Sequence, residues 1–294
     1  TLPFSKISHT IIIPHPPANL TSNRLMPFHS ELQHKLSNHF QNNEAHKQSF
    51  DALLVAQNTT SSHIIDSYLK ARKNNVEKSF QLLVDTLQWR IDTNISEINA
   101  QTMKSIRDLK GSYVGGLSER GDSVVYIIPG KYNPHSVEER LNYLVYLMEE
   151  GLRLSTTKRM IWIMDFAMYA KRAKDPDSKT VAFQSMHILQ HRYPETLEQL
   201  FVVDAPWFFR ALWFVLKPFI DSVTKQKIQF ISRSQSDLML QSISPEMLDV
   251  DFGGNLEITQ EMKADWSWVQ EELQKDKWQE IKRKFDQQES ASDE

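Results

Sequence analysis

The sequence predicts a mixed α/β protein, in which a small N-terminal helical module precedes an α/β lobe built on a largely parallel sheet. Between residues 50 and 91, apolar residues recur only at helical spacing. After residue 110, short apolar runs alternate with helical segments, a pattern typical of βαβ units. All eight glycines also lie in this second part of the chain. This change in composition places a boundary near residue 105.

The N-terminal part is expected to contain an arm and then the helical module. Residues 1–45 include five prolines, several histidines and no glycine, without sustained periodicity, so we expect an extended or disordered arm. The module should cover residues 46–105. Within it, Ser61 or Ser62 can cap the start of a helix, because a serine hydroxyl accepts a free backbone N–H. Asn74-Asn75 marks a break before the next helix.

The lobe, expected over residues 106–257, alternates strands and helices. Because a helix separates each expected strand from the next, parallel pairing with helical crossovers is the arrangement that the order favours. The expected strands are 124–128, 159–166, 199–205 and 227–231, and the expected helices are 137–154, 181–193 and the segment that begins at Trp207. Residues 258–294 read as a charged helix and tail, with Trp266, Trp268 and Trp278 as apolar anchors.

Composition excludes several classes of function. The formal net charge of −3 argues against a broad electrostatic partner such as nucleic acid. With no cysteine, the chain has no disulfides, thiolate metal sites or cysteine nucleophiles. The N-terminal residues lack the basic and long apolar regions of a secretory signal. We therefore expect a soluble cytoplasmic protein.

The sequence carries none of the common catalytic or nucleotide-binding motifs. It contains no Walker A, G-x-G-x-x-G or G-x-S-x-G pattern. His187 and His191 have a spacing that can seat zinc on a helix, but no third ligand lies at a suitable distance along the chain. We interpret them as partly exposed helix histidines, and we expect neither an enzyme nor a metal site.

The segment from Trp207 to Ile220 is unusually apolar for a helix. Eleven of its fourteen residues are apolar, and its two cations, Arg210 and Lys217, share one narrow edge of the helix. It is too short for a bilayer span, which needs about 20 apolar residues. On this evidence alone, a core helix, a membrane-touching lid and a partner-binding helix remain open.

Six motifs, taken in order, resemble those of CRAL-TRIO lipid-binding proteins, and most closely the fungal-type phosphatidylinositol-transfer branch. The resemblance covers roughly residues 60–255. The motifs are YLKARK (68–73) with Leu87, Trp89 and Arg90, IMDF (163–166), HRYPE (191–195), FVVDAPWFF (201–209), KPFIDSVTKQKI (217–228) and Gly253-Gly254.

The resemblance implies a CRAL-TRIO fold, whose lipid cavity is closed by a movable gate helix. It also implies that a basic pair, a glutamate after Tyr-Pro, and a threonine and lysine after the gate hold the phosphatidylinositol headgroup. By this resemblance, the headgroup residues are Arg72, Lys73, Glu195, Thr224 and Lys227. The gate residues are Trp207, Phe208, Phe209, Leu212, Trp213, Leu216 and Phe219.

The resemblance also assigns strand residues to the cavity, namely Tyr126, Met160, Trp162 and Met164. At the positions that align with Met160 and Trp162, family members that also hold phosphatidylcholine carry hydroxyl side chains. Since both residues are bulky and apolar here, we expect weak phosphocholine binding and a sterol or another apolar molecule as any second ligand.

The expected function is that of a phosphatidylinositol-binding lipid transfer or exchange protein. It would carry one lipid between membranes, without covalent chemistry, or present it to lipid-modifying enzymes. The bound phospholipid is the ligand and no cofactor is expected. Expected partners are membrane lipids, through transient peripheral contact, and lipid kinases, with the protein itself a monomer. A sensor or carrier of another small hydrophobe, such as a sterol or haem, and a scaffold protein are the alternatives.

Overall fold

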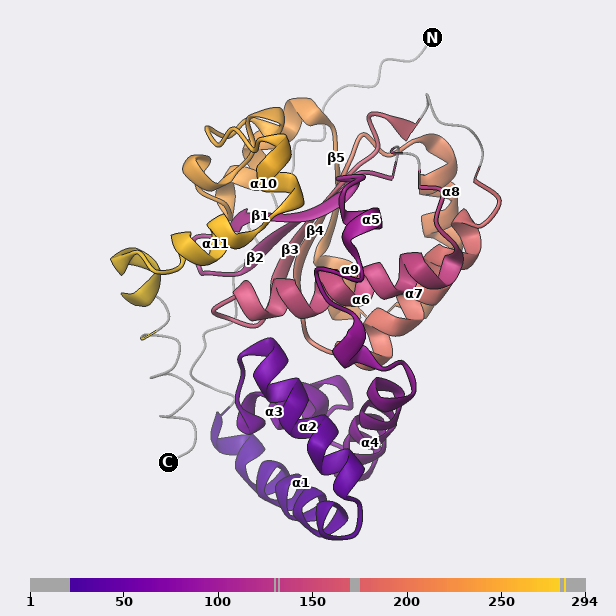
Figure 1. Cartoon of the computed structure of the whole chain (residues 1–294), viewed down its shortest axis with the longest axis vertical. Coiled ribbons are helices and arrows are strands. Elements are labelled where there is room, and N and C mark those ends of the chain that lie inside the picture. Colours follow the sequence, from indigo (N-terminus) through magenta and orange to yellow (C-terminus); the bar gives the residue numbers. More distant parts are fainter. Residues whose placement is uncertain are drawn as a thin grey trace, which may run out of the picture.

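The computed structural model describes residues 22–129, 131, 133–169, 175–220, 222–280 and 283. These residues fold into an N-terminal helical module and a larger α/β lobe (Figure 1), which confirms the predicted fold class. The four module helices pack around one apolar cluster of their own. They are α1 (Ser22–Asn42), α2 (Glu44–Gln57), α3 (Ser61–Ala71) and α4 (Val76–Asp92).

Helix α1 contradicts the extended arm expected over residues 1–45. That expectation is wrong from Ser22 onward, because α1 docks against α3 and α4 and buries Leu32 and Leu36. The stretch 1–21 lies outside the described residues. The module therefore begins at least one helix earlier than the sequence suggested.

The two inner helices of the module begin where polar side chains cap them. The cap of α3 is Thr60, just before the predicted serines, and its side chain accepts the backbone N–H of His63. Asn75 caps α4 in the same way by accepting from Lys78. The predicted break at Asn74-Asn75 is confirmed, since Asn74 adopts the left-handed conformation.

The lobe contains a five-stranded sheet in the order β1-β2-β3-β4-β5. The first strand runs antiparallel to the second, and the remaining pairs are parallel. The strands are β1 (Ser112–Leu117), β2 (Ser123–Ile127), β3 (Met160–Asp165), β4 (Leu197–Val203) and β5 (Ile228–Ile231). The antiparallel strand β1 was not predicted.

Three helical crossovers connect the parallel strands. Since the strands follow one another in sheet order and such crossovers are right-handed, all three lie on one face of the sheet. They are α6 (Val137–Leu154), α7 (Ser178–Arg192) and α8 (Trp207–Leu216), the last continued by η4 (Lys217–Phe219) and α9 (Ser222–Gln226). Figure 1 shows α6 between the sheet and the module, with α7 beside it, whereas α8 lies at the side of the sheet away from the module.

The opposite face of the sheet is covered by the C-terminal segment. Its elements contact β1 and end in a region where Trp266 and Trp278 are buried, so these predicted anchors are confirmed. The charged helix expected over 258–294 is interrupted in its described part. The C-terminal segment after β5 contains five short helical elements in its described part. They are η5 (Arg233–Gln241), η6 (Pro245–Met247), η7 (Val250–Phe252), α10 (Gln260–Ala264) and α11 (Ser267–Glu272). The module and β1 are joined through η2 (Ile95–Glu97) and α5 (Lys104–Arg107).

Strand alternation separates the expected cavity residues. Tyr126 pairs with Ile163 in register, whereas Met160, Trp162 and Met164 occupy the alternate positions and face the crossover helices. The Tyr126 ring stacks on Tyr113, and its hydroxyl accepts the backbone N–H of Asp249 in the C-terminal segment. Tyr126 therefore lies on the opposite face of the sheet from the three other expected cavity residues.

Candidate lipid-binding site

Helix α8 exposes large apolar side chains on its outer side. Trp207 is 80% exposed and Phe214 is 72% exposed, and Val215 is also largely exposed. The α-helix ends at Leu216, directly before its C-cap Lys217, because Pro218 disfavours a continuing helix. No described side chain of α8 is buried, which excludes the core-helix interpretation.

The inner side of α8 contacts the sheet through aromatic rings. Phe209 lies 4.4 Å from Phe166, measured between ring centroids, and Trp213 lies 5.7 Å from Phe230 of β5. The Arg210 guanidinium stands 5.5 Å from the Phe230 ring centre. The helix is thus apolar on both sides, and aromatic rings make its contacts with Phe166 and Phe230. The side chains of Leu212, Leu216 and Phe219 are outside the described set.

The sheet face beneath α8 is incompletely covered. Leu200 and Phe230 point toward the crossover helices from neighbouring strands, yet both remain half-exposed. Met164 is likewise half-exposed, and Trp162 is 7% exposed. Met160 differs from these, because it is fully buried and packs against Gly151 of α6. The apolar face available to a ligand therefore lies toward β4 and β5, and Met160 lies outside it.

The predicted headgroup segments converge on the loop between α7 and β4. From the module side, the Tyr68 hydroxyl of α3 donates to the Arg192 carbonyl at 3.3 Å. From the lobe side, the Lys227 ammonium donates to the Leu197 carbonyl at 2.6 Å. Glu195 lies between these two anchor points in the chain. The loop between α7 and β4 is thus in contact with α3 on one side and with Lys227 on the other.

Within these segments, the individual side chains differ in exposure. Arg72 follows Tyr68 by one helical turn, is half-buried, and donates to the carbonyl of Ala71 at 3.0 Å. Lys73 and Glu195 are exposed, and both adopt left-handed backbone conformations with φ of 52° and 60°. Thr224 is half-buried in α9, and its carbonyl accepts the Lys227 backbone N–H at 3.1 Å.

A buried ion pair joins the module to the lobe beside this loop. Arg90 of α4 makes two hydrogen bonds to Glu149 of α6, at 2.6 and 3.2 Å. Glu149 also accepts the Tyr193 hydroxyl at 2.8 Å and the Gln57 side-chain amide at 3.3 Å. Burial lowers the pKa of Arg90, but the adjacent Glu149 more than offsets this, so that the pKa lies above its ordinary value. Sequence reasoning used Trp89-Arg90 only as a family motif and missed this role.

Asp165, at the carboxyl end of β3, has a structural partner. Its carboxylate accepts from Arg233 at 2.7 Å, and Arg233 also stands 4.8 Å from the Phe252 ring centre. This pair ties the end of β3 to the segment after β5. The Asp165 carboxylate is thereby held in a structural ion pair.

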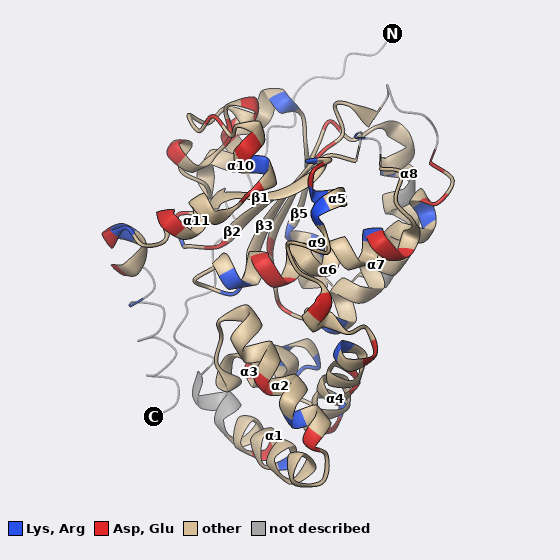
Figure 2. Ribbon diagram, in the orientation of Figure 1, with Lys and Arg blue, Asp and Glu red and all other residues tan. Residues whose placement is uncertain are grey.

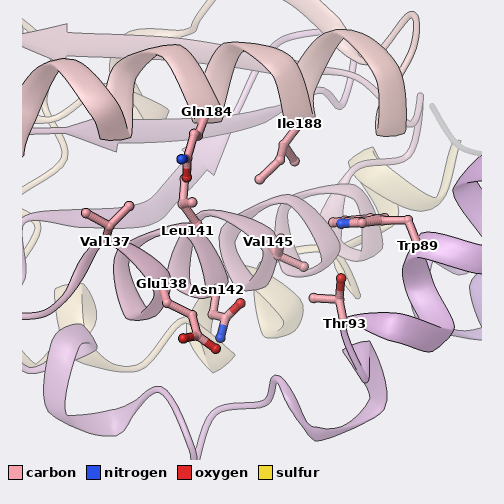
Figure 3. A pocket seen from close by; sticks show the side chains of 9 residues that line it. All are labelled: Trp89, Thr93, Val137, Glu138, Leu141, Asn142, Val145, Gln184 and Ile188. Carbon is pink, nitrogen blue, oxygen red and sulfur yellow. The ribbon is translucent and has the colours of Figure 1, made fainter.

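A separate pocket lies between α4, α6 and α7. Its volume is about 360 Å³, and its residues are Trp89, Thr93, Val137, Glu138, Leu141, Asn142, Val145, Gln184 and Ile188. Figure 3 shows the Trp89 ring at one end, with Ile188 and Gln184 projecting from α7 toward α6. None of the predicted headgroup, gate or cavity residues lines it.

Charge and metal-ligand patterns do not point to another kind of site. Acidic and basic residues are interspersed along the described elements of the module and the lobe (Figure 2). Among the described residues, no group of three or more His, Cys, Asp or Glu side chains is arranged to hold a metal ion. No described helix is both long enough and apolar enough to cross a bilayer.

Several known proteins are similar to this chain. Patellin-5 of Arabidopsis thaliana is 25% identical over 240 residues, which cover 76% of this chain and 35% of that protein. The phosphatidylinositol transfer protein PDR17 of Saccharomyces cerevisiae is 23% identical over 211 residues, covering 68% of this chain and 59% of PDR17. The crystal structure of Sfh5 aligns with a TM-score of 0.47 at 23% identity, covering 56% of this chain and 62% of Sfh5. The chain spans less than two thirds of each of these proteins.

The model of the CRAL/TRIO domain matches residues 107–254, from α5 to Gly254. This match covers half of the chain and includes the whole sheet and its three crossover helices. The chain therefore belongs to the CRAL/TRIO domain family.

Proposed function

We propose that this protein binds one phospholipid, with phosphatidylinositol preferred, and transfers it between membranes. The observation that carries the proposal is the position of α8. Its exposed outer residues include Trp207 and Phe214, while its inner side faces the half-exposed apolar strands β4 and β5. A helix of this kind tolerates lipid on both sides. PDR17, a relative, is named a phosphatidylinositol transfer protein.

The acyl chains supply most of the binding free energy in this proposal. A diacyl lipid carries on the order of thirty CH₂ groups, each worth about 0.8 kcal/mol on burial, so the chains would cost more than about 20 kcal/mol in water. Water must therefore be excluded during transport. The face formed by Leu200, Phe230 and Met164 is where we place the chains, with α8 as the gate over them.

The headgroup residues select the lipid. Arg72, Lys73 and Lys227 supply cations and Thr224 a hydroxyl for the phosphate, whereas Glu195 can accept hydrogen bonds from inositol hydroxyls. Each charge-assisted bond contributes about 1.5 to 3 kcal/mol, far less than the chains together. The chains thus hold the ligand, and the headgroup residues decide which lipid is held.

The role of the segment after the gate can be tested with a double variant, Thr224→Val with Lys227→Met. We expect phosphatidylinositol transfer between vesicles to fall at least about tenfold, because two polar partners of the phosphate are lost. Lys225→Met is the matched control, since Lys225 lies on the same short helix α9. It should transfer lipid as the wild type does.

Circular dichroism and thermal unfolding of all three proteins check that the fold is retained. This check is needed because the Lys227 ammonium also donates to the Leu197 carbonyl. Undiminished transfer by a folded double variant would refute the headgroup assignment. Mass spectrometry of lipid that copurifies with the wild type tests the ligand itself. A bound haem or sterol in place of phosphatidylinositol would support a carrier of another small hydrophobe.

The second ligand is proposed to be a sterol or another apolar molecule. Trp162 offers no hydroxyl to a phosphocholine group, and Met160 is buried under α6, out of reach of a ligand. Phosphatidylcholine uptake should therefore be much weaker than phosphatidylinositol uptake. Equal uptake of the two lipids from vesicles would contradict this. In the same proposal, α8 makes the transient membrane contact, and lipid kinases receive the presented lipid.

A further inference from the structure

We propose that residues 191–193, at the end of α7, are a positioning segment through which the helical module sets the headgroup loop. Tyr68, Thr86 and Tyr193 are its positioning residues. They act through Glu195 rather than by touching the lipid. This inference rests on the proposed function for the role of Glu195, and it adds a reason why the module is part of the binding site.

Three consecutive residues of this segment are held, and two of them directly by the module. The Tyr68 hydroxyl of α3 donates to the Arg192 carbonyl at 3.3 Å. The Thr86 hydroxyl of α4 lies 3.2 Å from the His191 carbonyl and shares its single proton between that carbonyl and the Leu82 carbonyl, at 2.9 Å. The third residue, Tyr193, donates to Glu149 at 2.8 Å. Glu149 in turn is held by Arg90 of α4, so this contact also leads back to the module.

Little backbone freedom remains between this anchored segment and the headgroup carboxylate. Only Pro194 separates Tyr193 from Glu195. Pro194 is buried and has a fixed φ, and Glu195 itself adopts a φ of 60°, in the left-handed region. Lys227 holds the other end of the loop by its contact with Leu197. The backbone position of Glu195 is therefore set from both ends of the loop.

The headgroup site is divided between the two units of the fold. Arg72 and Lys73 belong to the module, whereas Glu195 and Lys227 belong to the lobe. A phosphoinositol group needs both halves at a fixed separation, because its hydrogen bonds to each half depend on distance and angle. The contacts of residues 191–193 lie at the interface between the module and the lobe. They are placed to fix that separation.

The two tyrosines remain donors over the whole physiological range. Burial raises the pKa of Tyr68 to about 12. Burial, and then the negative charge of Glu149, raise the pKa of Tyr193 well above its ordinary value. Both hydroxyls therefore keep the proton that they donate. This supports a constant structural link rather than a switch.

The test compares Tyr68→Phe and Tyr193→Phe with Tyr143→Phe. The control also removes one buried tyrosine hydrogen bond, from the Tyr143 hydroxyl to the Ser112 carbonyl at 2.6 Å, but within the lobe and away from the loop. Uptake from vesicles is measured for phosphatidylinositol and for diacylglycerol, which has the same chains without the headgroup. Amide hydrogen exchange is followed over residues 195–197.

We expect both test variants to lose about five- to tenfold in phosphatidylinositol uptake, the effect of one hydrogen bond, with diacylglycerol uptake unchanged. Exchange over residues 195–197 should become faster in both. The control should change neither quantity. A parallel loss for both lipids, or the same loss in the control, would show a merely structural role and overturn the proposal.

The hydrogen-exchange arm separates this inference from the proposed function. If the wild type takes up no phosphatidylinositol, the proposed function fails, and exchange alone decides whether the segment positions the loop. Faster exchange in Tyr68→Phe and Tyr193→Phe, but not in Tyr143→Phe, would then uphold the positioning. Unchanged exchange in the two test variants would overturn it.

Discussion

The Arg90 guanidinium of α4 and the Glu149 carboxylate of α6 form a buried, two-bonded ion pair across the contact between the module and the lobe, at 2.6 and 3.2 Å. Two neutral donors, from Tyr193 and Gln57, complete the surroundings of the carboxylate. A buried charge pair is costly to assemble, but it is far more costly to leave half of it behind. This relationship makes the pair a point at which the two units depend on each other.

Replacing Arg90 by methionine should destabilise the protein by about 3 to 5 kcal/mol, because Glu149 would be left buried without its cation. The free energy of unfolding, measured in urea at pH 7, checks this. Lys104→Met is the control, since Lys104 pairs with Asp108 at an exposed position in the same chain. That loss should stay below about 1 kcal/mol.

A double variant that also replaces Glu149 with leucine gives a sharper test of the cause. Because the unpaired charge is then removed, the double variant should be more stable than Arg90→Met alone. If the double variant is instead less stable than the single one, the loss comes from packing at Arg90. The unpaired carboxylate would then not be its cause.

The parallel part of the fold was predictable because its elements carry strong local signals. Helix α6 begins at Val137 and ends at Leu154, as expected, and Ser136 with Glu139 forms a capping box at its start. The four parallel strands are short apolar runs bounded by polar residues. Strand β1 was missed, since Gly115 and Gly116 interrupt its apolar pattern.

Features set by tertiary contacts were less accessible to sequence reasoning. In α1, Phe28, Leu32, Leu36 and Phe40 recur every four residues, a stripe that the prolines and histidines around it obscured. The face of Tyr126 depends on strand register, which the sequence does not show. For the candidate site, the residue types came from the family resemblance. The contacts that bring them together, such as Tyr68 with Arg192, join residues that are 124 positions apart.

The second glycine of the Gly253-Gly254 motif is required by a close backbone approach. A Cβ at Gly254 would lie 1.8 Å from the Leu248 carbonyl oxygen, which belongs to a segment held under the sheet. Gly254→Ala should therefore lower the free energy of unfolding by about 2 to 3 kcal/mol, the cost of overpacking against a backbone atom that cannot rotate away. Chemical denaturation gives the measurement.

Gly111→Ala is the matched control for this steric effect. A Cβ there meets nothing closer than 3.7 Å, from Lys131, and so should change stability by less than about 1 kcal/mol. A loss at Gly254 no larger than that at Gly111 would show that the Leu248 segment moves aside at little cost.

The contact between His39 of α1 and His46 of α2 should make the module sensitive to acid. Nε2 of His39 lies 2.8 Å from Nδ1 of His46, whose other nitrogen lies 2.9 Å from the Gln88 side-chain oxygen. One proton between these two nitrogens forms a hydrogen bond, whereas a proton on each nitrogen would place two positive rings against each other. Burial, and then the charge of His46, lower the pKa of His39 below its ordinary value of 6.5.

The sign of the pH effect follows from this lowered pKa. The unfolded chain takes up a proton at His39 more readily than the folded chain does, so the free energy of unfolding should decrease as the pH falls below about 6.5. We expect the decrease between pH 7.5 and pH 5 to be smaller in His39→Gln, which does not titrate. His34→Gln, an exposed position on the same helix, should keep the wild-type decrease. Burial also lowers the pKa of His187, but the wild type and both variants contain His187, so it does not affect their comparison. Identical pH dependence in the wild type and His39→Gln would show that the pair does not couple protonation to folding.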